Sequence, residues 1–152
     1  MPVPAVLRSL TRPSLRGLIV RSDAAIGRLS GYRWSLLRFL PGTCPVVLHL
    51  TGRRSGEVRH TTLLGVRESD RIFLVGSNWG QPVVPAWVHN LRASGPRVEA
   101  TVRGHRGSWR WRELAGAERA HAWQAVVREW PAFEDYAVTA HRLIPVFGLE
   151  PE

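Results

Sequence analysis

Two short apolar runs, residues 46–50 and 63–66, flank a polar segment that begins Thr51-Gly-Arg-Arg-Ser-Gly56. Apolar runs of this length on either side of a glycine-containing turn predict two strands joined through that turn. This feature constrains the chain most, because it commits the middle of the sequence to a sheet and places the turn at one rim of that sheet.

A second strand signal is the alternation in residues 108–114, where Trp109 and Trp111 would lie on one face and Arg110 and Arg112 on the other. This pattern is typical of an antiparallel sheet with one solvent-exposed face. We expect a chain that is mainly β with helices (α+β), folded as a small antiparallel barrel with flanking helices. The expected strands cover residues 46–51, 59–66, 71–77, 97–103 and 106–114, and the expected helices cover 85–93 and 117–129.

The first turn is rich in groups that bind anions. Arg53, Arg54 and Arg59 would project from the rim of the sheet, where guanidinium groups can hold a phosphate or carboxylate in bidentate fashion. Gly52 and Gly56 lack a Cβ, so backbone N–H groups can approach a ligand closely. The sequence therefore predicts an anion-binding turn. The alternative is an ordinary hairpin whose arginines are solvated.

The second informative segment runs from the expected strand at 71–77 through a polar loop into the helix expected at 85–93. Pro85 suits a helix start, where a missing N–H costs nothing. Trp87 and Asn90 are three residues apart and would share one helical face. That face predicts a wall for a planar heteroaromatic ligand with polar edges. The alternative is a core tryptophan beside a capping asparagine.

Taken in order along the chain, these motifs resemble the deazaflavin-dependent nitroreductase family. Its members use coenzyme F420, a deazaflavin that carries a phosphate and a polyglutamate tail. The resemblance covers roughly residues 44–148, and several separated motifs in the right order are more specific than any single one. Its elements are residues 51–56 with Arg59, then Gly76, Ser77 and Gly80, then Pro85, Trp87, Asn90 and Leu91, then residues 130–136, and last residues 142–146.

The resemblance implies a split β-barrel of the flavin-reductase type. It also implies an F420-dependent oxidoreductase that transfers hydride to a small hydrophobic acceptor, a quinone first, with nitroaromatics and enones behind it. The cofactor would supply the hydride chemistry and the protein its placement. The implied cofactor-binding residues are Arg53, Arg54, Ser55, Gly56, Arg59, Thr61, Ser77, Asn78, Gly80, Pro85, Trp87 and Asn90. The implied acceptor pocket is Trp79, Phe133 and Tyr136, and the implied catalytic residues are Ser77 and Tyr136.

Three places in the chain depart from the family pattern. Arg54 stands where the family commonly has lysine, in a chain that contains no lysine. After Ser77 the family often has a basic residue and two glycines, whereas this chain has Asn78, Trp79 and Gly80, and the indole of Trp79 could narrow the pocket or stack on the ligand. Phe133 replaces a tyrosine, and a phenyl ring cannot donate a proton. Tyr136 or Ser77 would then have to take that role.

The cysteine and histidine content argues against disulfide or metal chemistry. Cys44 is the single cysteine of the 152 residues, which excludes an intramolecular disulfide and fits a reducing, cytoplasmic compartment. We expect it to be a small buried hydrophobe. The six histidines show no metal-ligand spacing, so no metal is expected.

The formal net charge of +9 indicates an anionic partner. The first 40 residues contain seven arginines (Arg8, Arg12, Arg16, Arg21, Arg28, Arg33 and Arg38) against one acid, Asp23. We interpret residues 1–40 as a basic, amphipathic, helical arm and residues 41–152 as the barrel domain. Such an arm suits the anionic inner face of the plasma membrane. The alternative is a helix that packs across one end of the barrel.

Other functions remain open at this stage. A barrel of this type could bind a flavin or deazaflavin without turnover, act only at a membrane surface, or use FMN in place of F420. Nucleic-acid binding is not expected, because no recognised RNA-binding motif is present. The acceptor and the oligomeric state are left undetermined.

Overall fold

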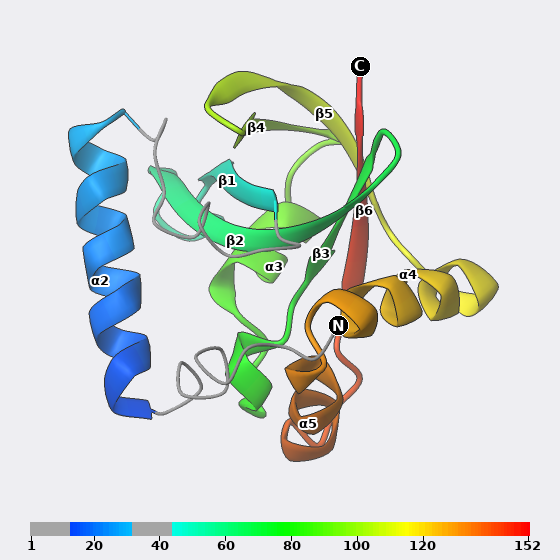
Figure 1. Cartoon of the computed structure of the whole chain (residues 1–152). Coiled ribbons are helices and arrows are strands. Elements are labelled where there is room, and N and C mark those ends of the chain that lie inside the picture. The colour runs from blue at the N-terminus through cyan, green and yellow to red at the C-terminus, as the bar shows by residue number, and fades with distance from the viewer. Residues whose placement is uncertain (1–12, 32–43) are drawn as a thin grey trace.

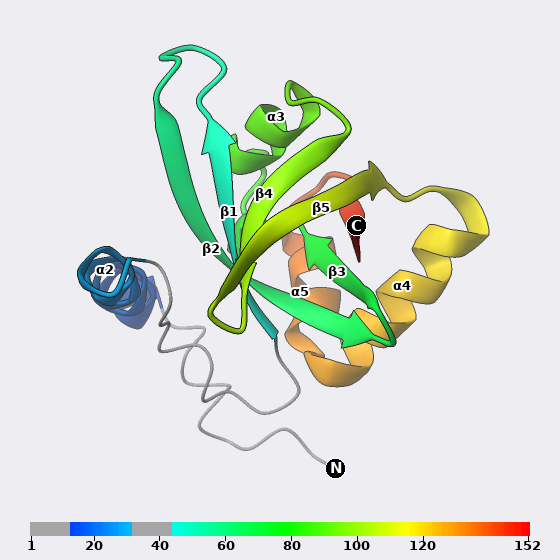
Figure 2. The same ribbon diagram turned by 90° about the horizontal axis from the view of Figure 1, so that it is seen from above.

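The computed structural model describes residues 13–31 and 44–152, and its strands form one closed barrel. Around the barrel the order is β1, β2, β3, β6, β5, β4, and each neighbouring pair is antiparallel. Figures 1 and 2 show this arrangement from two directions. The predicted fold class is confirmed. The strands are β1 (Cys44–Thr51), β2 (Val58–Glu68), β3 (Arg71–Val75), β4 (Arg97–Val102), β5 (His105–Glu113) and β6 (Val146–Pro151).

The inside of the barrel is filled by alternate residues of its strands. Val46, Leu48 and Leu50 of β1 are buried in one apolar cluster with Phe147 and Leu149 of β6. Burying an aliphatic side chain of this size stabilises the fold by about 1.5–3 kcal/mol. The apolar run that predicted β1 therefore forms the barrel core.

The alternation predicted for β5 is confirmed. Trp109 and Trp111 pack against the barrel cluster, and Trp111 meets the Phe147 ring edge-on with centroids 5.9 Å apart. Arg110 and Arg112 are exposed on the opposite face.

Helices cover the outside of the barrel. In the described part of the chain the helical elements are α2 (Pro13–Leu29), the short helix η2 (Asn78–Gly80), α3 (Ala86–Arg92), α4 (Gly116–Glu129) and α5 (Ala132–Thr139). Ala122, Ala125 and Val126 of α4 form a second buried cluster with Phe73 of β3 and Val146 of β6. α5 packs against η2, and α3 packs against β1. These contacts fix the elements that surround the candidate site.

The N-terminal helix α2 stands beside β2 in both views (Figures 1 and 2). Among its described side chains, Leu18 is 64% exposed and Leu29 is 90% exposed. Within residues 13–31 and 44–152, no helix is long and apolar enough to cross a membrane. The parts of the predicted arm at 1–12 and 32–40 lie outside the described residues.

One strand end and two missed elements are the main differences from expectation, and the other expected elements agree within two residues at each end. β3 ends at Val75 rather than at residue 77, because Ser77 already has helical backbone angles (φ −72°, ψ −31°). β6 was not predicted, since Gly148 interrupts its short apolar run and Pro145 and Pro151 stand at its two ends. α5 was not predicted either, because eight residues are too few for a clear helical period.

Candidate functional site

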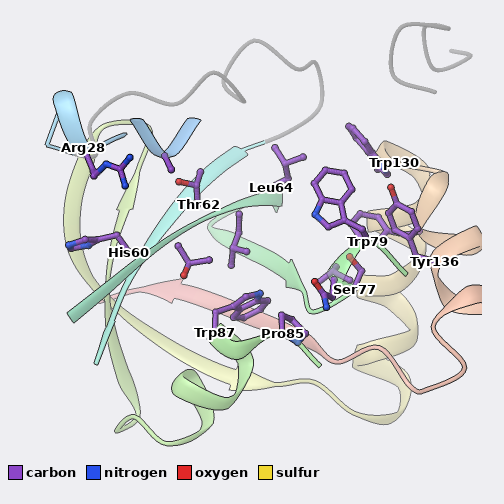
Figure 3. Close-up of a pocket in the computed structure, with 16 residues that line it drawn as sticks. Arg28, His60, Thr62, Leu64, Ser77, Trp79, Pro85, Trp87, Trp130 and Tyr136 are labelled. Atoms are coloured by element: carbon purple, nitrogen blue, oxygen red, sulfur yellow. The ribbon is translucent and has the colours of Figure 1, made fainter. Parts of the chain in front are cut away.

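A pocket of about 390 Å³ lies along one edge of β2 (Figure 3). From Val58 to Gly65, β2 pairs with β1 on one side, whereas β3 pairs only with the segment from Val66 to Glu68. The other edge of residues 58–65 has no described strand beside it. It faces the loop after β3 and the start of α3. Small-molecule sites typically occupy about 300–1,000 Å³, so the pocket is large enough for a ligand.

Five residues predicted to bind the cofactor line this pocket: Thr61, Ser77, Asn78, Pro85 and Trp87. Thr61 comes from β2, Ser77 and Asn78 from the loop after β3, and Pro85 and Trp87 from the start of α3. The Trp87 ring also packs on Phe147 in the barrel core, with centroids 5.5 Å apart. Trp87 is therefore both a core residue and a wall of the pocket. The two alternatives given for Trp87, a ligand wall and a core tryptophan, are compatible.

The loop after β3 has an unusual backbone. Asn78, Trp79 and Gly80 have φ angles of 49°, 57° and 76°, which form a left-handed turn. Glycine adopts this region freely, whereas side-chain-bearing residues rarely do. At Gly80 a Cβ would also collide with the Thr139 hydroxyl and lie 3.1 Å from the Tyr136 Cα. Gly80 is thus needed for the close approach of the loop to α5, and it does not line the pocket itself.

Arg142 holds this loop by hydrogen bonds to its backbone. Its Nη2 donates to the carbonyl oxygens of Gly76 (3.1 Å), Ser77 (3.1 Å) and Val83 (3.3 Å), and its Nε donates to that of Gln81 (3.3 Å). Burial lowers the pKa of Arg142 from its ordinary value. One half-buried guanidinium therefore fixes both ends of the loop.

One end of the pocket is aromatic. Trp79, Trp130, Phe133 and Tyr136 all line it, the last two from α5. Tyr136 meets Trp79 edge-on at 6.4 Å and Phe133 edge-on at 5.7 Å. The three residues predicted for the acceptor pocket are thus brought together. Ser77 also lines the pocket, and only 9% of its surface is exposed.

The residues of the arginine-rich turn are not brought into the pocket. Arg53, Arg54 and Arg59 are exposed, and Arg59 donates to Glu57 at 3.2 Å. The Asn90 side chain accepts the backbone N–H of Arg53 at 3.2 Å, so it ties the turn to α3. The turn therefore stands next to the helix that forms one pocket wall, outside the cavity.

Two other residues of the turn have local roles. The hydroxyl of Ser55 accepts the N–H of Glu57 at 3.3 Å. Gly56 adopts φ +70° with open space around its Cα. Both residues belong to the bend that carries the exposed arginines. Their predicted contact with a ligand remains a prediction.

Sequence reasoning missed several lining residues. Ala24 and Arg28 come from α2, and their contribution could not be predicted because the sequence does not report which part of the barrel the helix lies beside. His60, Thr62, Leu63, Leu64, Val75 and Trp130 also line the pocket. The lining residues of β2 are consecutive, so side chains from both faces of the strand reach the pocket. They could have been predicted by assuming that a ligand binds along the edge of this strand.

His60 belongs to a hydrogen-bonded group that the sequence did not predict. Its Nδ1 lies 2.7 Å from the Nδ1 of His49, and the Nε2 of His49 lies 2.8 Å from the Thr101 hydroxyl. His49 is buried, and burial lowers its pKa from the ordinary value, with a smaller contribution from Arg106. The group crosses β2, β1 and β4, and its member His60 lines the same end of the pocket as Arg28 (Figure 3).

Cys44 is buried, as predicted, and burial is the main cause that raises the pKa of its thiol. No group of histidine, cysteine or carboxylate side chains in residues 13–31 and 44–152 could hold a metal ion.

The described residues form a small antiparallel barrel with an aromatic pocket at an edge of β2 that has no described strand beside it, and these features define the class of the protein. The family model described as F420H(2)-dependent quinone reductase matches residues 21–151. The chain therefore belongs to the F420H(2)-dependent quinone reductase family, and the predicted resemblance to deazaflavin-dependent reductases is confirmed.

Individual relatives agree with this assignment. F420H(2)-dependent quinone reductases of Mycobacterium tuberculosis strains CDC 1551 / Oshkosh and ATCC 25618 / H37Rv are each 41% identical over 64 residues. These matches cover 41% of this chain and 42% of each relative. A solved structure of an F420-H2 dependent reductase superposes with a TM-score of 0.62 at 34% identity, covering 70% of this chain and 93% of that one.

Proposed function

We propose that this protein is an F420-dependent oxidoreductase that delivers hydride from the reduced deazaflavin to a small hydrophobic acceptor, with quinones as the preferred class. The observation that carries the proposal is the pocket itself. It combines a flat indole wall, Trp87, with the polar side chains of Thr61, Ser77 and Asn78. Membership of the family supports the same cofactor.

The residues present fit a deazaflavin. The edge of β2 that has no described strand beside it offers alternating backbone N–H and C=O groups, which match the polar edge of a planar heteroaromatic ring. Trp87 and Pro85 would cover one face of that ring. Ser77 and Asn78 would approach its polar edge, and Gly80 would let their loop pack closely on α5. When bound, the cofactor supplies the hydride.

The anionic part of the cofactor would extend out of the pocket to the turn. Arg53, Arg54 and Arg59 offer guanidinium groups there, with Ser55 and Gly56 shaping the bend. Asn90 supports this arrangement because it ties the turn to α3, the helix that carries Trp87.

The acceptor would occupy the aromatic end, between Trp79, Phe133 and Tyr136. Reduction of a quinone by hydride leaves an oxyanion that needs a proton. Phe133 has none to give, so we assign this role to the hydroxyl of Tyr136 or Ser77, both of which line the same end.

The test is a titration of the purified protein with oxidised F420, followed by ligand fluorescence, with FMN as competitor. The double variant Arg54→Ala, Arg59→Ala should lose most of the affinity. The matched control Arg110→Ala, Arg128→Ala removes the same charge from exposed positions outside the pocket and should bind like the wild type. Binding of FMN alone would overturn the cofactor assignment.

A non-catalytic deazaflavin-binding protein is the second candidate, favoured by the phenylalanine at position 133. Turnover separates the two. Oxidation of reduced F420 by menadione supports the reductase, whereas tight F420 binding with no turnover supports the binding protein.

We also propose that the protein works in the cytoplasm as a peripheral protein on the inner face of the plasma membrane. Leu18, Arg21, Arg28 and Leu29 of α2 are exposed, which gives the helix apolar and cationic side chains to present to anionic lipid. The test is cosedimentation with vesicles of phosphatidylglycerol and phosphatidylcholine. Leu18→Ser together with Leu29→Ser should reduce binding, and binding that these changes leave intact would contradict the proposal.

A further inference from the structure

Trp79 has a backbone conformation that a tryptophan rarely adopts. Its φ and ψ are 57° and 31°, and the preceding Asn78 also has a positive φ of 49°. For a residue with a Cβ, this region costs roughly 1–2 kcal/mol. Asparagine tolerates it better than a bulky aromatic residue does. Such strain persists only where the surroundings enforce it, and it concentrates at functional sites.

The surroundings of Trp79 do enforce it. Arg142 donates to carbonyl oxygens on both sides of the turn, those of Ser77 at 3.1 Å and Gln81 at 3.3 Å. The Asn78 side chain donates to the carbonyl of Val83 at 3.0 Å. On the far side, Gly80 packs so closely on α5 that a single added methyl group would not fit. The turn is therefore fixed at three points.

The strained position aims the indole into the pocket. Trp79 lines the pocket and meets Tyr136 edge-on at 6.4 Å. In Figure 3 Trp79 lies between Leu64 of β2 and Tyr136 of α5, so its indole extends across the aromatic end of the pocket. A glycine here would satisfy the same backbone without strain and would leave that span open. The chain therefore combines a strained backbone at this position with a bulky side chain in the cavity.

We propose that Trp79 determines the size of acceptor that the pocket takes. Its indole closes the aromatic end to all but narrow, flat ring systems, and Arg142 acts as the positioning residue that holds it there. This inference rests on the proposed function for the identity of the acceptor as a quinone, and it assigns the selectivity among quinones to one side chain.

The test compares the dissociation constants of menadione, with two fused rings, and phenanthrenequinone, with three. Both are measured by equilibrium dialysis against the full chain without cofactor, so the result does not depend on turnover. Trp79→Asn keeps a residue that tolerates the left-handed turn. It should shift the affinity ratio about tenfold in favour of phenanthrenequinone, the size of effect that pocket shape usually controls.

Two further variants keep the test decisive. Trp79→Gly should shift the ratio in the same direction, and serves if the asparagine variant does not fold. Trp109→Thr removes an indole that lies on β5 outside the pocket, and it should leave the ratio unchanged. A wild-type ratio in both folded Trp79 variants would overturn the proposal, as would the absence of quinone binding by the wild type.

The positioning role of Arg142 is tested by a double-mutant cycle. A lysine cannot reach four carbonyl groups at once, so Arg142→Lys should shift the ratio in the same direction as Trp79→Asn. In the Trp79→Asn background the same change should add nothing. An additive shift would overturn the positioning role. Failure of the proposed function would be seen in a separate experiment, as the absence of F420 binding to the wild-type protein.

Discussion

The turn between β1 and β2 and the loop between β3 and α3 both contain glycines, polar groups and positive φ angles, but they are built in opposite ways. At the turn, Gly56 has open space around it and the arginine side chains are exposed. At the loop, Gly80 is pressed against α5 and Arg142 holds four carbonyl groups. The turn suits a flexible anionic tail, whereas the loop suits a rigid ring whose position controls chemistry.

The largest expected effect separates the two glycines. Gly80→Ala combines a disfavoured φ with a collision against Thr139 and Tyr136, so it should lower the free energy of unfolding by about 3 kcal/mol. Gly56→Ala has the same disfavoured φ but open space, and should cost about 1 kcal/mol. Urea denaturation followed by circular dichroism measures both. Equal losses would show that the loop is not packed as described.

The next comparison is between two arginines. Arg142→Gln removes the guanidinium that donates to the carbonyl groups of Gly76 and Ser77, of which Ser77 keeps the N–H of Gly80, and it should lower the free energy of unfolding by about 2 kcal/mol. Arg53→Gln changes an exposed side chain whose backbone N–H, not its guanidinium, bonds to Asn90, so its effect should stay within about 0.5 kcal/mol. The same denaturation experiment reports both values.

Asn90 joins the two regions, since it ties the turn to the helix that follows the loop. Asn90→Ala removes the acceptor for the Arg53 N–H and should cost about 1 kcal/mol. Asn90→Asp keeps an acceptor and should be nearly as stable as the wild type, but its negative charge beside the turn should weaken F420 binding. Unchanged F420 affinity in the aspartate variant would show that the turn is not part of the cofactor site.

The smallest effect concerns pH and a third region, the pair of His49 and His60. Burial lowers the pKa of His49 in the folded state, so the unfolded chain takes up the proton at higher pH. Stability from this group is complete above its ordinary pKa of about 6.5 and declines as the pH falls below that value. His49→Gln should show a shallower loss of unfolding free energy between about pH 7.5 and pH 5.5. A loss as steep as that of the wild type would assign the pH dependence to other groups.

Much of the fold follows from patterns that short windows of sequence carry. Alternating Trp109 and Trp111 predicted β5, and the apolar run of residues 46–50 predicted β1. β6 was missed because a glycine interrupts its apolar run and prolines stand at its two ends, yet it completes the barrel by pairing with β3 and β5. Its position is determined by long-range pairing, which no local pattern reports.

The candidate site was predictable to a similar degree. Ser77, Trp87 and Tyr136 lie on elements whose order matches a known family, and all three line the pocket. Arg28 and His60 line it too, but they depend on how α2 packs beside β2 and on which edge of β2 stays open. The strain at Trp79 was not predictable, because two of the contacts that fix the turn come from distant parts of the chain, Arg142, which is 63 residues away, and α5.

The open edge of β2 also bears on how the protein behaves between synthesis and ligand binding. An unpaired strand edge is a template on which a second chain can add by backbone hydrogen bonds, and natural proteins usually cover such edges. Here residues 58–65 have a described neighbour on one side only, and a ring bound there would occupy the groups that another strand would use. The bound ligand would therefore block pairing of this strand edge with another chain. Preparations without cofactor should aggregate faster on concentration than saturated ones, a difference that light scattering measures directly.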